Sequence, residues 1–159
     1  MKWPLMKDSI DEQQRQTMVD FIKTTKKFTN GEKVREFEKK WAEWLGVDYA
    51  LFVNSGGSAN LLLLDAIAYL YFKTPNAIHN HSYKQWILNR PPKVLTPSCT
   101  WGTTIAPLLQ CGLKPVYCDI ELDTYSFAEE EMRHIAANTQ IDIVWITHLL
   151  GSPNNMALI

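Results

Sequence analysis

A short run of small residues, Ser55-Gly56-Gly57-Ser58-Ala59-Asn60, has the composition of a phosphate-binding turn. It lies between an apolar segment, residues 49–53, and a long apolar segment with helical character. A helix that begins here would present free backbone N–H groups and the positive end of its dipole, and both favour a phosphate. Glycines let the main chain approach a ligand closely, and Ser58 can add a hydroxyl donor. An ordinary turn with a serine cap is the alternative interpretation.

Other chemical motifs are weak or missing. The sequence contains neither the G-x-G-x-x-G of dinucleotide sites nor the Gly-Lys-Ser/Thr of a P-loop. His79 and His81 have a metal-like spacing, but they lie in a polar stretch without a third ligand, which favours a solvated loop. The glutamates at 129–131 begin a predicted helix, where carboxylates offset the helix dipole. We therefore predict no metal site.

The length and composition indicate one globular domain with small-molecule ligands. The chain has 159 residues, of which 46% are hydrophobic and 21% charged. A net charge of -1 gives no reason to expect a nucleic-acid or anionic-membrane partner. Neither a secretory signal nor a membrane span is recognisable, so we expect a cytoplasmic location. The three cysteines form no C-x-x-C pair and are expected to be reduced thiols.

Hydrophobic periodicity predicts helices and strands in alternation along most of the chain. Two amphipathic helices come first, and Gly46 is expected to end the second of them. Strands that alternate with helices imply one parallel sheet with right-handed crossovers. A polar stretch at 73–92 is interpreted as a long connection or insertion. The predicted helices are 8–26, 31–45, 58–72, 103–111 and 128–137, and the predicted strands are 49–53, 93–96, 115–118 and 141–147.

Several blocks, in order along the chain, resemble the DegT/StrS-type nucleotide-sugar aminotransferases and dehydratases. The resemblance covers nearly the whole chain except the stretch at 73–92. Its specificity comes from the number of blocks that match in the same order. They are Phe28-Thr-Asn-Gly31, Leu45-Gly46-Val47, Val53-Asn-Ser-Gly-Gly-Ser-Ala-Asn-Leu61, Pro97-Ser-Cys-Thr-Trp-Gly-Thr-Thr104, Gly112-Leu-Lys-Pro-Val-Tyr-Cys-Asp119 and Thr147-His-Leu-Leu-Gly-Ser-Pro153.

The resemblance implies the fold type I architecture of pyridoxal 5'-phosphate (PLP) enzymes. In that fold a mostly parallel sheet flanked by helices holds PLP or pyridoxamine 5'-phosphate (PMP), and a homodimer completes each site. Residues 1–159 would be the N-terminal part of the major domain, which is then incomplete. Residues 1–45 would form its N-terminal helices, and residues 46–159 its alternating strands and helices.

The resemblance also assigns cofactor-binding residues. Gly56, Gly57, Ser58 and Ala59 would hold the cofactor phosphate, although the family often has a hydroxyl residue where Gly57 stands. Trp101 would stack on the pyridine ring, with Thr103 and Thr104 beside it. The alternatives are a core tryptophan, packed among leucines such as Leu64 and Leu108, and threonines that cap a helix. His148, in the family's His-x-x-Gly block, is interpreted as structural.

The cofactor interpretation makes a geometric prediction. Ligands of open parallel sheets collect outside the carboxyl ends of the strands. The turn at 55–59 and Trp101 both follow such ends, so we expect them to face one cavity, on the order of 10 Å apart or less. If Ser58 and Trp101 opened onto opposite faces of the sheet, the cofactor assignment would fail.

No catalytic residue is assigned in this chain. In the resembling family, the carboxylate that pairs with the pyridine nitrogen and the Schiff-base lysine both follow the His-x-x-Gly block. No lysine here lies in the matching context, so we expect a truncated family member that is inactive alone. A C-terminal half could be encoded separately, and the isolated chain is expected to be poorly soluble or to associate.

The expected family activity is transfer of an amino group from an amino acid, usually glutamate, to a keto-sugar nucleotide, in the synthesis of surface polysaccharides or glycosylated metabolites. The first alternative is a PMP-dependent 3-dehydratase of a nucleotide-linked 4-keto-6-deoxysugar. The motif Ser-Ala-Asn-Leu61, the segment 103–107, Gln110 and the longer connection favour that branch. A non-catalytic remnant and a phosphate-binding module unrelated to PLP are further alternatives.

Overall fold

The computed structural model of the chain describes residues 9–72 and 90–159. His79 and His81, which were interpreted as part of a solvated loop, lie outside the described residues, as does most of the predicted connection. The chain divides into two compact units between Phe52 and Val53. In the described part of the chain, no helix has the length and apolar character that a membrane crossing requires.

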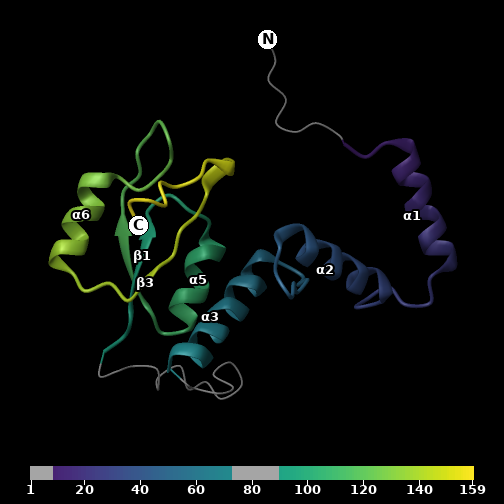
Figure 1. Cartoon of the computed structure of the whole chain (residues 1–159), viewed down its shortest axis with the longest axis horizontal. Helices are drawn as coiled ribbons and strands as arrows, with labels where there is room; N and C mark the ends of the chain where they lie inside the picture. Colours follow the sequence, from purple (N-terminus) through teal and green to yellow (C-terminus); the bar gives the residue numbers. More distant parts are fainter. Residues whose placement is uncertain (1–8, 73–89) are drawn as a thin grey trace, which may run out of the picture. The chain divides into compact units, whose positions relative to one another are not determined.

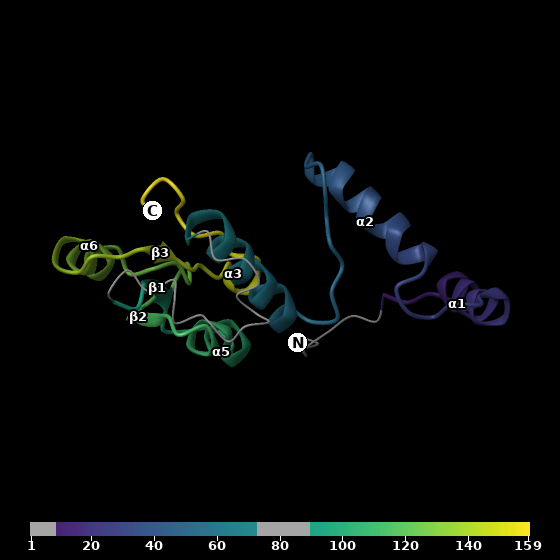
Figure 2. The same ribbon diagram turned by 90° about the horizontal axis from the view of Figure 1, so that it is seen from below.

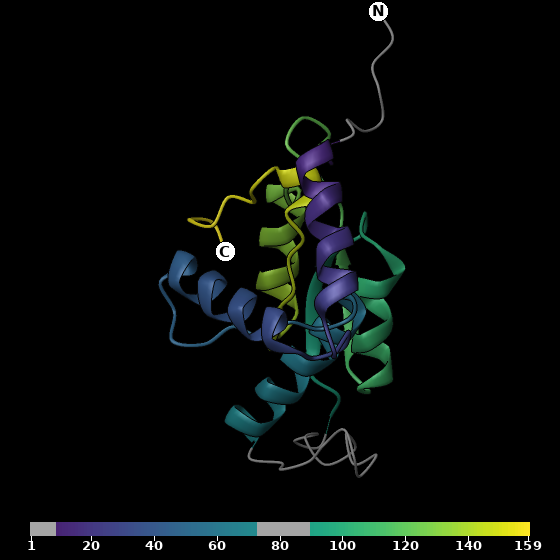
Figure 3. The same ribbon diagram turned by 90° about the vertical axis from the view of Figure 1, so that its right-hand side faces the viewer.

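The first unit contains two helices, α1 (Glu12–Thr24) and α2 (Glu32–Leu45), which confirm the two predicted amphipathic helices (Figure 3). A capping box begins α1, since the Gln14 N–H donates to the Asp11 side chain at 2.8 Å and the Asp11 N–H donates to the Gln14 side chain at 3.0 Å. Gly46 ends α2 in the left-handed conformation with φ of 72°, as predicted.

The predicted strand at residues 49–53 is not formed, and this prediction is wrong. The segment pairs with no strand of the described chain, and Tyr49 is 90% exposed. The N–H of Phe52 donates to the Glu38 carboxylate of α2 at 3.0 Å. A strand needs a neighbour to accept its backbone hydrogen bonds, and apolar composition alone does not supply one.

The second unit is built on a parallel sheet of three strands, β1 (Lys93–Pro97), β2 (Lys114–Cys118) and β3 (Ile143–Val144), in the order β2-β1-β3. Leu95, in the middle of β1, lies opposite Val116 of β2 and Val144 of β3. These three strands and their parallel pairing were predicted. β3 is shorter than the predicted 141–147, although the Trp145 N–H still donates to the Leu95 carbonyl at 2.8 Å. Because β3 pairs with β1 alone in the described chain, only one of its sides is ordered by backbone hydrogen bonds.

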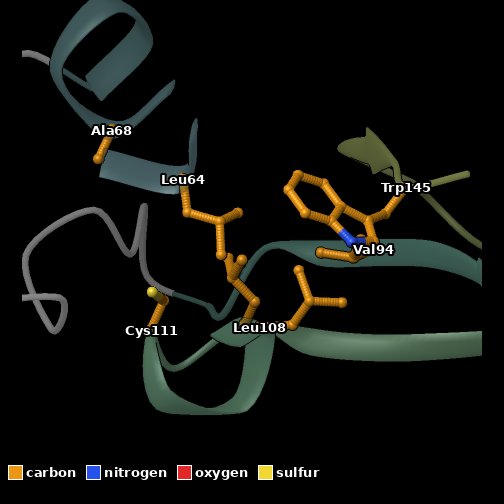
Figure 4. Packing of buried hydrophobic residues seen from close by; sticks show 7 residues of the cluster. Leu64, Ala68, Val94, Leu108, Cys111 and Trp145 are labelled. Atoms are coloured by element: carbon orange, nitrogen blue, oxygen red, sulfur yellow. The ribbon is translucent and has the colours of Figure 1, made fainter. Parts of the chain in front are cut away.

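Helices cover both faces of this sheet, which makes three layers (Figures 1 and 2). One face packs against α3 (Gly56–Phe72) and α5 (Gly102–Gln110), and the other against α6 (Glu129–Asn138). Alternate residues of β1 supply the two cores: Val94 belongs to the α3/α5 side, and Leu95 to the α6 side. Figure 4 shows the first core, where Leu64 of α3 and Leu108 of α5 pack in one cluster with Val94 and Trp145. The α/β fold class is therefore as predicted.

An ion pair fixes the amino ends of two strands. Arg90 forms a bidentate pair with Asp142, at 2.7 and 2.9 Å, and the Lys93 N–H donates to the same carboxylate at 2.8 Å. The Arg90 guanidinium first, and then the Lys93 N–H, hold the pKa of Asp142 below its ordinary value. The pair aligns the start of β1 with the start of β3.

Candidate cofactor site

The glycine turn forms the first turn of α3, which begins at Gly56, two residues earlier than predicted. Ser55 is the capping residue: its Oγ accepts the Ser58 N–H at 3.1 Å and donates to the Ser58 Oγ at 3.1 Å. The N–H groups of Gly56 and Gly57 make no hydrogen bond to any residue that the structure describes. The helix therefore begins with two N–H donors and one hydroxyl proton, that of Ser58, available to a ligand.

Ala59 differs from the residues before it. Its N–H already donates to the Ser55 carbonyl at 3.0 Å, inside the hydrogen-bond ladder of the helix. Ala59 can contribute a small side chain and its place in the positive end of α3, but not a free backbone donor.

Trp101 is the residue before α5, and its side chain is 75% exposed. The alternative that placed it in the core among Leu64 and Leu108 is therefore wrong. Thr103 and Thr104 lie inside α5, which has no side-chain cap, so helix capping does not account for them either. An exposed indole at the start of a helix leaves a flat aromatic face available for stacking.

Two contacts bring the glycine turn and the start of α5 together. The side-chain amide of Asn60 donates to the Thr103 carbonyl at 3.1 Å. A Cβ placed on Gly57 would lie 3.9 Å from the Thr103 Cβ. Trp101 is two residues before Thr103, so its Cα lies within about 8 Å of the Thr103 Cα. The starts of α3 and α5 therefore meet on the same face of the sheet, as the cofactor interpretation requires.

Beside this meeting point is a cavity of about 500 Å³. Its wall is apolar, formed mainly by α3 and β3, and four polar residues line it: Asn60, Thr104, Thr147 and His148. Neither the turn glycines nor Trp101 line this cavity, so it is not the single shared cavity that we expected. Asn60 follows the glycine turn in the sequence and Thr104 follows Trp101, and both of these residues line the cavity.

The carboxyl ends of all three strands converge near the same place. The Thr100 and Thr147 hydroxyls, which follow β1 and β3, are hydrogen-bonded at 2.9 Å. After β1, the Ser98 N–H donates to the Cys118 carbonyl at 2.8 Å, and the Ser98 hydroxyl donates to Asp119 at 3.2 Å. In an open α/β sheet, this edge is where ligands bind.

His148 has a structural contact, in line with its predicted role. Its Nδ1 accepts the Asn154 N–H at 3.1 Å, which in the neutral ring places the proton on Nε2. Asn154 itself is buried and was missed by the sequence analysis. Its side chain donates to the Thr147 carbonyl at 2.8 Å and accepts the Phe127 N–H at 3.3 Å. No local sequence signal marks an asparagine that joins segments this far apart.

Within residues 9–72 and 90–159, no three His, Cys, Asp or Glu side chains are grouped so as to hold a metal ion. The three cysteines form no disulfide; Cys99 is exposed, and Cys111 and Cys118 are buried. Burial, with a contribution from the Glu131 carboxylate, raises the pKa of the Cys118 thiol to about 11.

These features define a class: an α/β protein with a parallel sheet, a glycine-rich helix start and an exposed aromatic side chain after the carboxyl ends of the strands. The fold is that of PLP-dependent fold type I enzymes. The chain belongs to the DegT/DnrJ/EryC1/StrS aminotransferase family, whose profile matches residues 8–159. This confirms the resemblance found in the sequence. The family is PLP-dependent, as the cofactor in its solved structures shows.

Among curated relatives, the chain is 29% identical over 155 residues to the GDP-4-keto-6-deoxy-D-mannose 3-dehydratase of Escherichia coli O55:H7. That match covers 98% of this chain and 36% of the relative, so the chain spans little more than a third of the relative's length. It is 30% identical over 144 residues to the dTDP-4-dehydro-2,6-dideoxy-D-glucose 3-dehydratase of Saccharopolyspora spinosa, covering 91% of this chain and 28% of that protein.

Comparison with solved structures also finds similarity to 3-dehydratases. A crystal structure of the E. coli GDP-4-keto-6-deoxy-D-mannose-3-dehydratase with bound hydrated PLP is similar to this chain with a TM-score of 0.75 and 28% identity. The similarity covers 99% of this chain and 36% of that one. The fold of the second unit is thus found in enzymes that carry PLP.

Proposed function

We propose that this chain binds PMP or PLP at the start of α3, as part of an enzyme that acts on nucleotide-linked keto-sugars. The observation that carries the proposal is the pair of unbonded N–H groups of Gly56 and Gly57, held by α3 next to the segment that carries the exposed Trp101. A phosphate needs donors of this kind, and a planar ring needs such a face. The residues present therefore fit the cofactor of the family.

Each proposed cofactor residue has a distinct role. Gly56 and Gly57 donate N–H groups to the phosphate, and the Ser58 hydroxyl donates a third bond, which compensates for the missing hydroxyl at position 57. Ala59 leaves space beside the phosphate, and Trp101 stacks on the ring. Thr104, half-buried on α5, lines the cavity that leads to the substrate side. When bound, the cofactor supplies the electron sink for chemistry next to the sugar's keto group.

Between the two activities of the family, we propose 3-dehydration as the first candidate. Relatives named as 3-dehydratases, at 29% and 30% identity, support this choice. The sequence analysis placed the aminotransferase first, so this proposal reverses that order. A further relative at 31% identity over 121 residues, a lipopolysaccharide biosynthesis protein of Salmonella typhimurium, supports a role in polysaccharide synthesis.

Amino-group transfer from an amino acid, with glutamate as the expected donor, is the second candidate, and the family name supports it. The lysine of the family, or its replacement, would decide between the two activities. We propose that residues 1–159 form the cofactor-binding part of such an enzyme. A cytoplasmic location suits substrates of this kind.

Two equally exposed tryptophans provide the test of cofactor binding. Trp101 and Trp44 are each 75% exposed, and Trp101 belongs to the unit that carries the proposed site, whereas Trp44 belongs to the first unit. We expect W101A to weaken PMP binding in equilibrium dialysis by roughly tenfold or more, the effect of one stacked aromatic ring. W44A should leave the affinity unchanged. PMP is the better probe because it has no aldehyde and cannot form Schiff bases with surface lysines. Equal PMP affinities of W101A and wild type would contradict the proposal.

A further inference from the structure

A proline explains why the start of α5 can bind the start of α3. Pro107 lies inside α5 and has no N–H, so the Thr103 carbonyl, four residues before it, loses its usual helical donor. The Asn60 side-chain amide donates to that carbonyl instead, at 3.1 Å. Thr103 is exposed, so the Asn60 amide replaces water at this carbonyl and joins the two helices at this point.

We propose that Asn60, together with Pro107, is a positioning residue that sets the spacing between the phosphate turn and Trp101. The inference rests on the proposed function. Asn60 and Gly57 are three residues apart on α3 and face the same residue of α5, Thr103. Thr103 is two residues after Trp101. The bond therefore links α3, which would hold the phosphate, to α5, which begins directly after Trp101.

The way the two helices pack gives this bond its importance. Farther along, α3 and α5 are held by apolar contacts of residues such as Leu64, Ala68, Leu108 and Cys111. Apolar packing is non-directional and tolerates small sliding movements. A hydrogen bond prefers a narrow range of lengths and angles. At the end of the helices where a phosphate and a ring must be a fixed distance apart, the directional contact sets that distance.

The experiment measures two ligands on the purified chain. The affinity for inorganic phosphate reports on the turn at 55–59 alone, and the affinity for PMP reports on the turn and Trp101 together. We expect N60L, which keeps the side-chain shape and removes the donor, to weaken PMP binding roughly five- to tenfold, the affinity equivalent of one neutral hydrogen bond. Phosphate affinity should stay within about twofold. Q110L is the matched control, since Gln110 is an exposed amide at the other end of α5, and it should change neither affinity.

The proline supplies a second, independent variant. P107A restores an N–H that can donate to the Thr103 carbonyl within α5 and compete with the Asn60 amide, so P107A should itself weaken PMP binding. In the P107A background, N60L should weaken PMP binding by less than about twofold, which is a coupling between two residues that need not touch. Circular dichroism of each variant checks that the helices are intact.

The outcomes separate the two proposals. Equal weakening of PMP and phosphate by N60L, or an unchanged N60L effect in the P107A background, would show that Asn60 does not position the ring, and the inference would be overturned. A wild-type chain that binds phosphate but not PMP would instead overturn the proposed function. Selective loss of PMP affinity in N60L, with a smaller N60L effect in the P107A background, supports the inference.

Discussion

Two apolar segments of this chain, residues 49–53 and β1 (Lys93–Pro97), were both predicted to be strands of one sheet, and only the second is a strand. Leu95 of β1 is 3% exposed, whereas Leu51 is 69% exposed. β1 has β2 on one side and β3 on the other, with helices over both of its faces. Among the described residues, the side chain that hydrogen-bonds to the backbone of the segment at 49–53 is that of Glu38. The comparison shows that an apolar segment becomes a strand only where neighbouring strands accept and donate its backbone hydrogen bonds.

The largest expected difference is in the rates at which two cysteine thiols react, one buried in the sheet and one exposed just after a strand. Cys118 ends β2 opposite Pro97 and is buried, with a pKa of about 11, whereas Cys99 follows β1 and is exposed. At pH 8 about one Cys118 thiol in a thousand is ionised, and the side chain is also inaccessible. We expect Cys99 to react with a disulfide reagent about a thousandfold faster. C99S should remove the fast phase, and a fast phase that persists in C99S would contradict the burial of β2.

Shortening the two leucines tests the comparison directly. We expect L95A to lower the free energy of unfolding by about 3 kcal/mol, because it leaves a cavity between the sheet and α6. L51A should cost less than about 1 kcal/mol, because its side chain is already mostly in water. Urea denaturation followed by circular dichroism measures both. Equal losses for the two variants would mean that residues 49–53 are packed as well as β1.

The ion pair at the amino ends of β1 and β3 should have a smaller effect that depends on pH. D142N should lower the free energy of unfolding by roughly 1 kcal/mol at neutral pH, because it removes the charged partner of Arg90. The effect is small because both side chains are partly exposed to solvent. The folded pKa of Asp142 is lowered, so its stabilisation is present above the unfolded value, about 3.9, and is lost as pH falls through the lower folded value.

Thermal unfolding of D142N and wild type between pH 7 and pH 2.5 measures that dependence. The difference between the two should shrink below about pH 4. D123N, which changes an exposed aspartate in a loop, is the control and should behave like wild type. A D142N deficit that stays constant down to the lowest pH would contradict the ion-pair interpretation.

The smallest expected effect concerns the one anchor of the segment at 49–53. Glu38 accepts the Phe52 N–H, and also pairs with Arg35; both lower its pKa, the Phe52 contact most. E38Q keeps a weaker acceptor, so we expect faster hydrogen exchange at the Phe52 amide, with little change at neighbouring amides. E43Q, at an exposed position of the same helix, should leave Phe52 unchanged. Exchange at Phe52 that does not respond to E38Q would show that this anchor is not formed in solution.

The cofactor site was predicted in part, and the successes share a physical cause. The turn at 55–59 and the strands that precede α5 and α6 were recognised because local composition and helix signals mark them, whereas Trp101 was singled out by its match to a family block. The start of the helix was predicted two residues too late: α3 begins at Gly56, so Ser55 caps it and Ser58 is inside the helix. Two serines three residues apart offer equivalent local chemistry, and the choice between them depends on where the helix begins.

The sequence by itself determined the helices, the parallel α/β order and the family, because capping residues, glycine stops and hydrophobic periods act over a few residues. Only the tertiary structure decided which apolar segment became a strand, and which polar side chains join distant segments. Asn60 meets Thr103 across 43 positions of the chain, and Asn154 meets Phe127 across 27. Such bonds depend on the packing of whole helices against a sheet, so nothing in the residues nearby in sequence marks them.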